Sequence, residues 1–180
     1  MTRDQAIALM LRVEGGEANL TGDPGGHTKY GIIQRTLDAV RGIMTDAEDP
    51  IWPASVGDLT PGQATAIYRN VQWVHIRGND LDPALAVLML NAAVNMGEPH
   101  AIMLLQEAVG VTADGAFGSG TLGAVEAWHS PYMPEQTLAQ EYAAHAARRY
   151  AQLNATEGQF ELGWFRRLFL VYTLATASQT

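Results

Sequence analysis

Apolar side chains recur every three or four residues over most of the chain, which is the spacing of one face of an α-helix. The first such run covers residues 2–14 and stops at the paired glycines 15–16, so Glu14 is expected in the last helical turn. Thr60 and Gln63 flank a proline in the pattern of a capping box, which predicts another helix start. Further helices are expected at about residues 34–43, 83–95, 99–110, 118–129, 135–153 and 160–175.

Two segments interrupt this helical pattern. Residues 19–31 are rich in turn-forming types around Asp23-Pro24-Gly25-Gly26, and Thr28, Tyr30 and Ile32 then alternate as in a short strand. Residues 46–57 carry prolines and acids and are expected to form a loop. The run from Pro83 to Asn95 is apolar on every side, so it predicts a buried central helix. The expected fold is mainly α, with a small β-hairpin near residues 19–33.

Composition narrows the class of protein. The chain has 180 residues, 47% of them hydrophobic, which suits one compact core and a single globular unit. Its formal net charge is -8 and no window concentrates Lys or Arg, so we expect neither a nucleic-acid partner nor an anionic-membrane patch. The longest apolar run, residues 168–175, is far below the roughly 20 residues that span a bilayer, so no stable membrane insertion is expected.

The residue types exclude several chemistries. With no cysteine the chain has no disulfide and no thiolate nucleophile. The histidines show no closely spaced pair of the kind that binds zinc on one helix, so we expect no metal and no cofactor.

Glu14 and Asp23 suit the cleavage of a glycosidic bond, which needs one protonated carboxyl group and one carboxylate. The negative end of the helix dipole and partial burial would both disfavour the charged form of Glu14. Asp23, in an exposed turn, would stay ionised and hold a water that Thr28 orients. Spacing alone leaves open that Glu14 is a surface residue and Asp23 an ordinary turn residue.

Several distinctive motifs follow one another along nearly the whole chain. They are Glu14-Gly15-Gly16, Asp23-Pro24-Gly25-Gly26-His27-Thr28-Lys29-Tyr30-Gly31-Ile32, Ala93-Val94-Asn95-Met96-Gly97, Leu105-Gln106, Val109-Gly110-Val111, Asp114-Gly115, Gly118 with Thr121, and Gly163-Trp164 with Arg166-Arg167. Together they resemble glycoside hydrolase family 108, the N-acetylmuramidases of phages and prophages.

This resemblance implies a lysozyme-like helical fold and a muramidase whose acid is Glu14. It divides the single domain into a catalytic part, residues 1–90, and a helical peptidoglycan-binding part, residues 91–176. The order Glu14, Asp23, Thr28 is also similar to the acid, aspartate and threonine of phage-type lysozymes. His27 and Ile33 depart from the family pattern at positions that bear on water and sugar contacts.

Six residues are candidates for contact with the sugar chain. Aromatic rings stack on sugar faces and amides bind N-acetyl groups, although aromatic residues at helical spacing also build cores. The candidates are Tyr30, Gln34, Tyr68, Trp73, Asn91 and Asn95.

The expected reaction is hydrolysis of the β-1,4 bond between N-acetylmuramic acid and N-acetylglucosamine, with inversion. The alternatives are a lytic transglycosylase, for which a water-holding Asp23 and Thr28 would have no use, and a wall-binding module without catalysis. The N-terminal residues do not resemble a signal peptide. We therefore expect synthesis in the host cytoplasm, action on the wall in the periplasm, and dependence on a holin.

Overall fold

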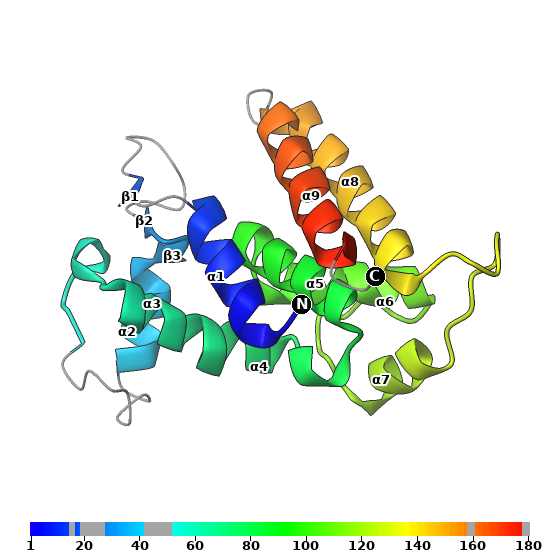
Figure 1. The fold of residues 1–180 in the computed structure, drawn as a ribbon, viewed down its shortest axis with the longest axis horizontal. Coiled ribbons are helices and arrows are strands. Elements are labelled where there is room, and N and C mark those ends of the chain that lie inside the picture. The colour runs from blue at the N-terminus through cyan, green and yellow to red at the C-terminus, as the bar shows by residue number, and fades with distance from the viewer. Residues whose placement is uncertain (15–16, 19–27, 42–51, 158–160, 178–180) are drawn as a thin grey trace.

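The computed structural model describes residues 1–14, 17–18, 28–41, 52–157 and 161–177. These residues are mainly helical, with short strands joined in one small antiparallel sheet, which confirms the expected fold class (Figure 1). The helices are α1 (Arg3–Glu14), α2 (Gln34–Arg41), α3 (Pro61–Ile67), α4 (Trp73–His75), α5 (Pro83–Met96), α6 (Glu98–Val109), α7 (Ser119–Glu126), α8 (Leu138–Glu157) and α9 (Glu161–Ala177). The strands are β1 (Glu17–Ala18), β2 (Thr28–Lys29) and β3 (Ile32–Ile33).

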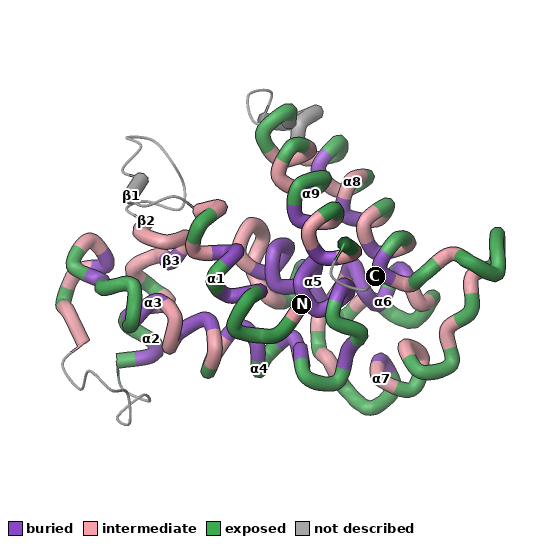
Figure 2. The backbone as a smooth tube through the Cα atoms, viewed as in Figure 1, coloured by how far each residue is buried: buried purple, intermediate pink, exposed green. Residues whose placement is uncertain are grey.

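Helix α5 is the centre of the core, as its apolar sequence predicts. Its residues 84–93 are all buried, and Figure 2 shows the buried class concentrated on this helix. Asp82 caps its start by accepting hydrogen bonds from the backbone N–H groups of Ala84 and Leu85. Gly97 ends it with a φ of 85°, a conformation that a side chain would strain.

The remaining helices pack around α5. The long helices α8 and α9 lie side by side and rise from α5 and α6, while α1 crosses α5 near the small sheet (Figure 1). Because both α1 and α9 contact α5, the first and last helices of the chain approach each other across it.

The capping hydrogen bonds predicted at two helix starts are present in the structure. At α3 the Thr60 hydroxyl accepts from the backbone N–H of Gln63 at 3.2 Å, and the Gln63 side chain accepts from the backbone N–H of Thr60 at 3.0 Å. Thr2 and Gln5 make the same reciprocal pair at the start of α1. After α3 the chain continues through a π-helical turn, Tyr68–Gln72, into α4.

The sheet differs from the single strand expected across residues 28–32. β1 pairs with β2 and β2 pairs with β3, both antiparallel, so two hairpins meet at β2. Tyr30 and Gly31 form the tight turn between β2 and β3, and both have positive φ (54° and 71°), the pattern of a two-residue type I′ hairpin. The alternation of Thr28, Tyr30 and Ile32 therefore predicted one strand where the chain forms two strands joined by a turn.

Within the described ranges, no helix combines the length and the apolar composition needed to cross a bilayer.

Candidate active site

Glu14 is the last residue of α1, and its side chain is only 15% exposed. Its Oε1 atom contacts Nη1 of Arg167, which projects from α9 and is also 15% exposed. An ion pair this buried needs further contacts to compensate for the water that both charges lose. The expected acid therefore lies against a cation from the far end of the chain.

The turn between β2 and β3 closes over the acid. A Cβ atom built on Gly31 would lie 2.8 Å from Cδ of Glu14 and 2.8 Å from Cγ1 of Val94 in α5. Gly31 is therefore required both by its positive φ and by the close approach of the Glu14 carboxyl group. Tyr30 takes the rarer positive φ of a non-glycine residue, and its carbonyl accepts a hydrogen bond from the Tyr68 hydroxyl at 2.8 Å.

Polar side chains from α5 and α8 continue the network beyond Arg167. Nε of Arg167 donates to Oδ1 of Asn91 at 2.6 Å, and Asn91 is buried at 1% exposure. One turn further along α5, Asn95 donates through Nδ2 to the hydroxyl of Tyr150 at 2.9 Å. Asn91 is thus joined to Glu14 through Arg167, and Asn95 is joined to Tyr150, whose pKa is raised by burial and lowered by hydrogen bonds from both amides.

The pKa values of two tyrosines, Tyr68 and Tyr150, are affected by the charges of this cluster. Burial raises the pKa of Tyr68 far above its ordinary value, and the Glu14 charge raises it further, while Arg167 opposes the shift. Burial also raises the pKa of Tyr150, against hydrogen bonds from Asn95 and Asn91 and the charge of Arg167. Both phenols are neutral near pH 7 and line a site whose charges are Glu14 and Arg167.

Of the other two residues of the expected catalytic set, the structure describes only Thr28. Thr28 is half-buried in β2, two residues before the turn that packs on Glu14. Asp23 lies outside the described residues.

Three of the expected sugar contacts have other roles in the structure. Tyr68 is fully buried and Trp73 is 5% exposed, with its indole N–H donating to Oδ1 of Asn79 at 2.8 Å, so neither ring has a face available to a sugar. The Gln34 amide accepts from the N–H of Val56 at 2.8 Å and donates to the carbonyl of Ala54 at 2.9 Å, so it fastens that segment to α2. Tyr30 is half-buried, with the Lys29 ammonium 5.7 Å from its ring centre.

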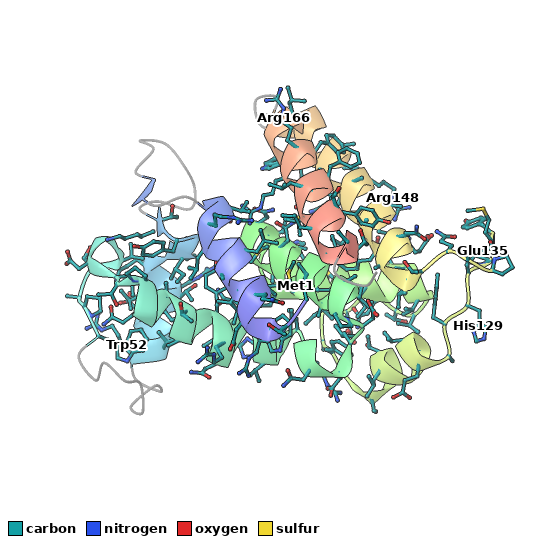
Figure 3. The ribbon with its side chains drawn as sticks, in the orientation of Figure 1. Met1, Trp52, His129, Glu135, Arg148 and Arg166 are labelled. Carbon is teal, nitrogen blue, oxygen red and sulfur yellow. The ribbon has the colours of Figure 1, made fainter. Side chains whose placement is uncertain are left out.

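Arg167 is one site residue that sequence reasoning missed. It appeared there only within the motif Arg166-Arg167. Helical periodicity could have separated the pair, because Arg166 is exposed at the outer end of α9 (Figure 3) whereas Arg167 faces the acid. The partner carboxylate, however, was not predictable without the fold.

The arrangement suits general acid catalysis. One carboxyl group lies at the edge of a mostly buried polar cluster, fixed by a guanidinium and surrounded by neutral amides and phenols. Once protonated, this fixed carboxyl group can give its proton to a leaving oxygen, and the adjacent cation then stabilises the carboxylate that forms. The Nη2 atom of Arg167 is buried and has no hydrogen-bond partner among the described residues.

Comparison with known proteins agrees with this chemistry. The family model described as glycosyl hydrolase 108 matches residues 7–97, and a model described as a predicted peptidoglycan domain matches residues 100–169. A solved structure of SagA from Brucella abortus is similar at a TM-score of 0.77 and 31% sequence identity, over 97% of this chain and 94% of that chain. No curated protein matches the chain. The chain belongs to glycosyl hydrolase family 108 and is a muramidase-type glycoside hydrolase that acts on peptidoglycan.

Proposed function

We propose that the enzyme is an N-acetylmuramidase that hydrolyses the β-1,4 bond between N-acetylmuramic acid and N-acetylglucosamine, with Glu14 as general acid. The observation that carries this proposal is the position of Glu14 at the end of α1, held by Arg167 and covered by the Tyr30–Gly31 turn. In this scheme Glu14 protonates the glycosidic oxygen as the bond breaks.

Arg167 acts as a positioning residue in the proposed mechanism. Its Nε is anchored on the buried Asn91, so its Nη1 holds the Glu14 carboxyl group in one orientation. As the proton leaves Glu14, negative charge develops on a carboxylate that already faces a guanidinium. A fixed charge of this kind stabilises the transition state without reorganising solvent.

Asp23 completes the proposal as the base that activates water, with Thr28 orienting that water, in a single inverting displacement. A water fits between the two carboxyl groups when they lie about 6.5–9.5 Å apart, whereas retaining enzymes hold them at about 5–5.5 Å. The β2 strand, which carries Thr28, leads directly into the turn that covers Glu14, and this supports placing the water on that side.

Analysis of the products from purified peptidoglycan tests the reaction. Mass spectrometry is expected to show new hydrated N-acetylmuramic acid at the reducing ends. Anhydro-muramic ends would instead identify a lytic transglycosylase, new N-acetylglucosamine ends would identify the other glycosidic bond, and no cleavage would favour a binding module. Proton NMR of the first product is expected to show the α-anomer, and a fresh β-anomer would rule out inversion.

An endolysin role is the cellular part of this proposal, supported by the resemblance of residues 14–32 to phage and prophage muramidases. The enzyme would then act on the wall in the periplasm and depend on a holin for access. Expression in bacteria with and without a holin tests this. Lysis that requires the holin supports the dependence, and lysis by the enzyme alone contradicts it.

A further inference from the structure

A cavity of about 230 Å³ lies beside the catalytic cluster, bounded by the end of α5, the start of α6, α8 and α9. Its wall combines three kinds of side chain. Asn95 and Tyr150 are polar and belong to the network described above, Met96 and Trp164 are apolar, and His100 and Arg149 are basic. The cavity is smaller than the roughly 300–1,000 Å³ that encloses a whole ligand, so it suits a branch of a larger substrate.

Tyr150 connects this cavity to the acid. Its hydroxyl accepts the hydrogen bond from Asn95, and its ring stacks on Trp164 with the two ring centres 5.6 Å apart. Tyr150 also lies within the electrostatic reach of Glu14 and Arg167, since both charges affect its pKa. The cavity therefore shares two wall residues, Asn95 and Tyr150, with the polar cluster around Glu14 and Arg167.

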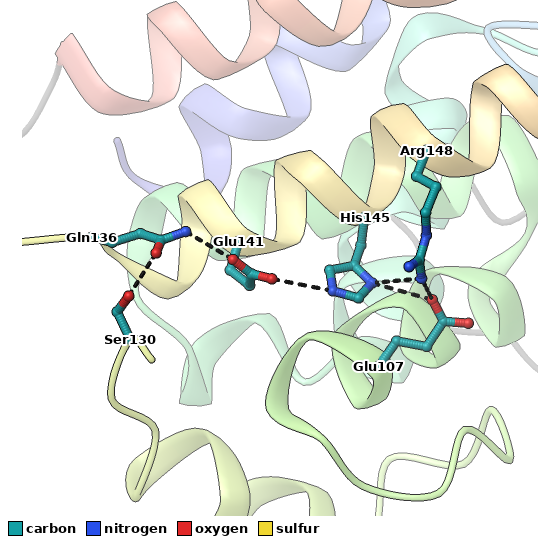
Figure 4. Close-up of polar contacts among 6 residues, drawn as sticks. All are labelled: Glu107, Ser130, Gln136, Glu141, His145 and Arg148. Atoms are coloured by element: carbon teal, nitrogen blue, oxygen red, sulfur yellow. Dashed lines mark hydrogen bonds and ion pairs between the residues drawn. The ribbon is translucent and has the colours of Figure 1, made fainter. Parts of the chain in front are cut away.

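Two neighbouring arginines on α8 differ in what they bind. Arg148 donates to Glu107 at 2.9 Å and contacts His145, and the other ring nitrogen of His145 faces Glu141 (Figure 4). The positive charge of Arg148 is therefore already compensated by a carboxylate. Arg149 is half-buried at the cavity, and among the described residues no carboxylate pairs with it. A cation that is partly removed from water and has no partner among the described residues is suited to an anionic ligand.

The muramidase substrate offers such an anion at the required place. N-acetylmuramic acid carries its stem peptide on the ring that is cleaved, a few bonds from the scissile oxygen, and stem peptides bear free carboxylates and alanyl methyl groups. Methyl groups suit the Met96 and Trp164 wall, and a carboxylate suits Arg149. Because the peptide branches from the reacting sugar, its binding site has to lie close to Glu14.

We propose that this cavity is a subsite for the acidic stem peptide of peptidoglycan, with Arg149 pairing a stem-peptide carboxylate. The proposal rests on the muramidase function proposed above. It assigns the peptide to residues from α5, α6, α8 and α9. Binding energy gained there would place the muramic ring against the acid.

The test compares two substrates and two variants. Peptidoglycan glycan strands are prepared with their stem peptides and, after amidase treatment, without them. Arg149→Gln is expected to raise the KM for the peptide-bearing strands about tenfold, the effect of one lost charge-assisted hydrogen bond, and to leave the KM for bare strands unchanged. Arg148→Gln is the matched control and is expected to behave as wild type on both substrates.

A free stem tetrapeptide provides a second measurement that does not depend on turnover. It is expected to bind the wild-type enzyme and the Arg148→Gln variant in calorimetry, and to bind Arg149→Gln at least tenfold more weakly. An Arg149→Gln variant with wild-type KM on peptide-bearing strands, or an equal loss on both substrates, would overturn the subsite. If the wild-type enzyme cleaves neither substrate, the proposed function itself fails. If it cleaves both, and Arg149→Gln does not change the KM for peptide-bearing strands relative to bare strands, only the subsite is overturned.

Discussion

Two independent features of the structure require a glycine at position 31. Its φ of 71° closes the β2–β3 turn, and its missing side chain leaves room for the Glu14 carboxyl group and Val94. A methyl group added there would meet atoms on both sides and would also strain the backbone. The position of Glu14, the proposed acid, therefore depends directly on this glycine.

Gly31→Ala is predicted to lower the free energy of unfolding by about 1–3 kcal/mol, because the methyl group has to displace Glu14 or Val94. The rate of peptidoglycan hydrolysis is expected to fall with it, since Glu14 moves. Gly123→Ala is the control, because Gly123 lies inside α7 with no atom near its added Cβ and should gain about 0.5–1 kcal/mol. Urea unfolding and wall lysis measure both variants. Normal stability and rate in Gly31→Ala would contradict the packing described.

At the scale of whole elements, helix α9 completes the candidate active site. It packs on α5, and from there Arg167 reaches both Asn91 of α5 and Glu14 of α1. The region matched by the peptidoglycan model, residues 100–169, therefore supplies a residue to the site of the acid. The two matched regions share one site in the folded chain.

Arg167→Met is predicted to leave the Glu14 carboxylate without its partner, at a cost to stability of about 3–5 kcal/mol. At temperatures where the variant is folded, kcat is expected to fall roughly tenfold to a hundredfold with a smaller change in KM, because the acid loses its orientation. Arg167→Lys should recover part of kcat since it keeps the charge. Arg166→Met, at an exposed position, should stay within about 0.5 kcal/mol of wild type. An Arg167→Met enzyme with unchanged kcat would remove the positioning role.

Local chemistry made several elements predictable from the sequence. The Thr60–Gln63 capping box, the proline at the start of α5 and the glycine after α6 each act within a few residues, and the structure confirms all three. The Glu14–Arg167 contact joins opposite ends of the chain, so no local pattern encodes it. From the sequence, Tyr68 and Trp73 are candidates for both a sugar contact and the core, because helical spacing does not distinguish a ring in the core from one in a groove.

At the scale of the whole molecule, the buried tyrosines make the free energy of unfolding depend on pH in the alkaline range. Tyr68, Tyr142 and Tyr150 are each 1% exposed or less, and burial raises the pKa of all three above the ordinary value. In the unfolded chain these phenols lose their protons near pH 10, whereas the folded chain keeps them. Their contribution to stability is therefore complete below about pH 10 and is lost as the pH rises further.

The free energy of unfolding is predicted to be nearly constant with respect to these groups from about pH 8 to 9.5, and to fall above about pH 10 by up to about 1.4 kcal/mol per pH unit for each tyrosine. Urea unfolding across this range measures the slope. Tyr142→Phe should make the slope shallower, while Tyr132→Phe, which changes a residue that is 75% exposed, should not. A flat profile up to pH 11 in the wild-type enzyme would contradict the burial of these groups.

The central claim is that Glu14 is the acid of a peptidoglycan-cleaving enzyme, and the rate of the Glu14→Gln variant on purified peptidoglycan tests it most directly. The amide is nearly isosteric but has no acidic proton, so the rate should fall by roughly 10²–10⁴-fold. Because the neutral amide would leave the charge of Arg167 unpaired, the assay is run well below a melting temperature measured for the same sample. Glu126→Gln, at an exposed position in α7, is the control and should retain the wild-type rate. A folded Glu14→Gln enzyme that hydrolyses peptidoglycan as fast as this control would show that Glu14 is not the acid.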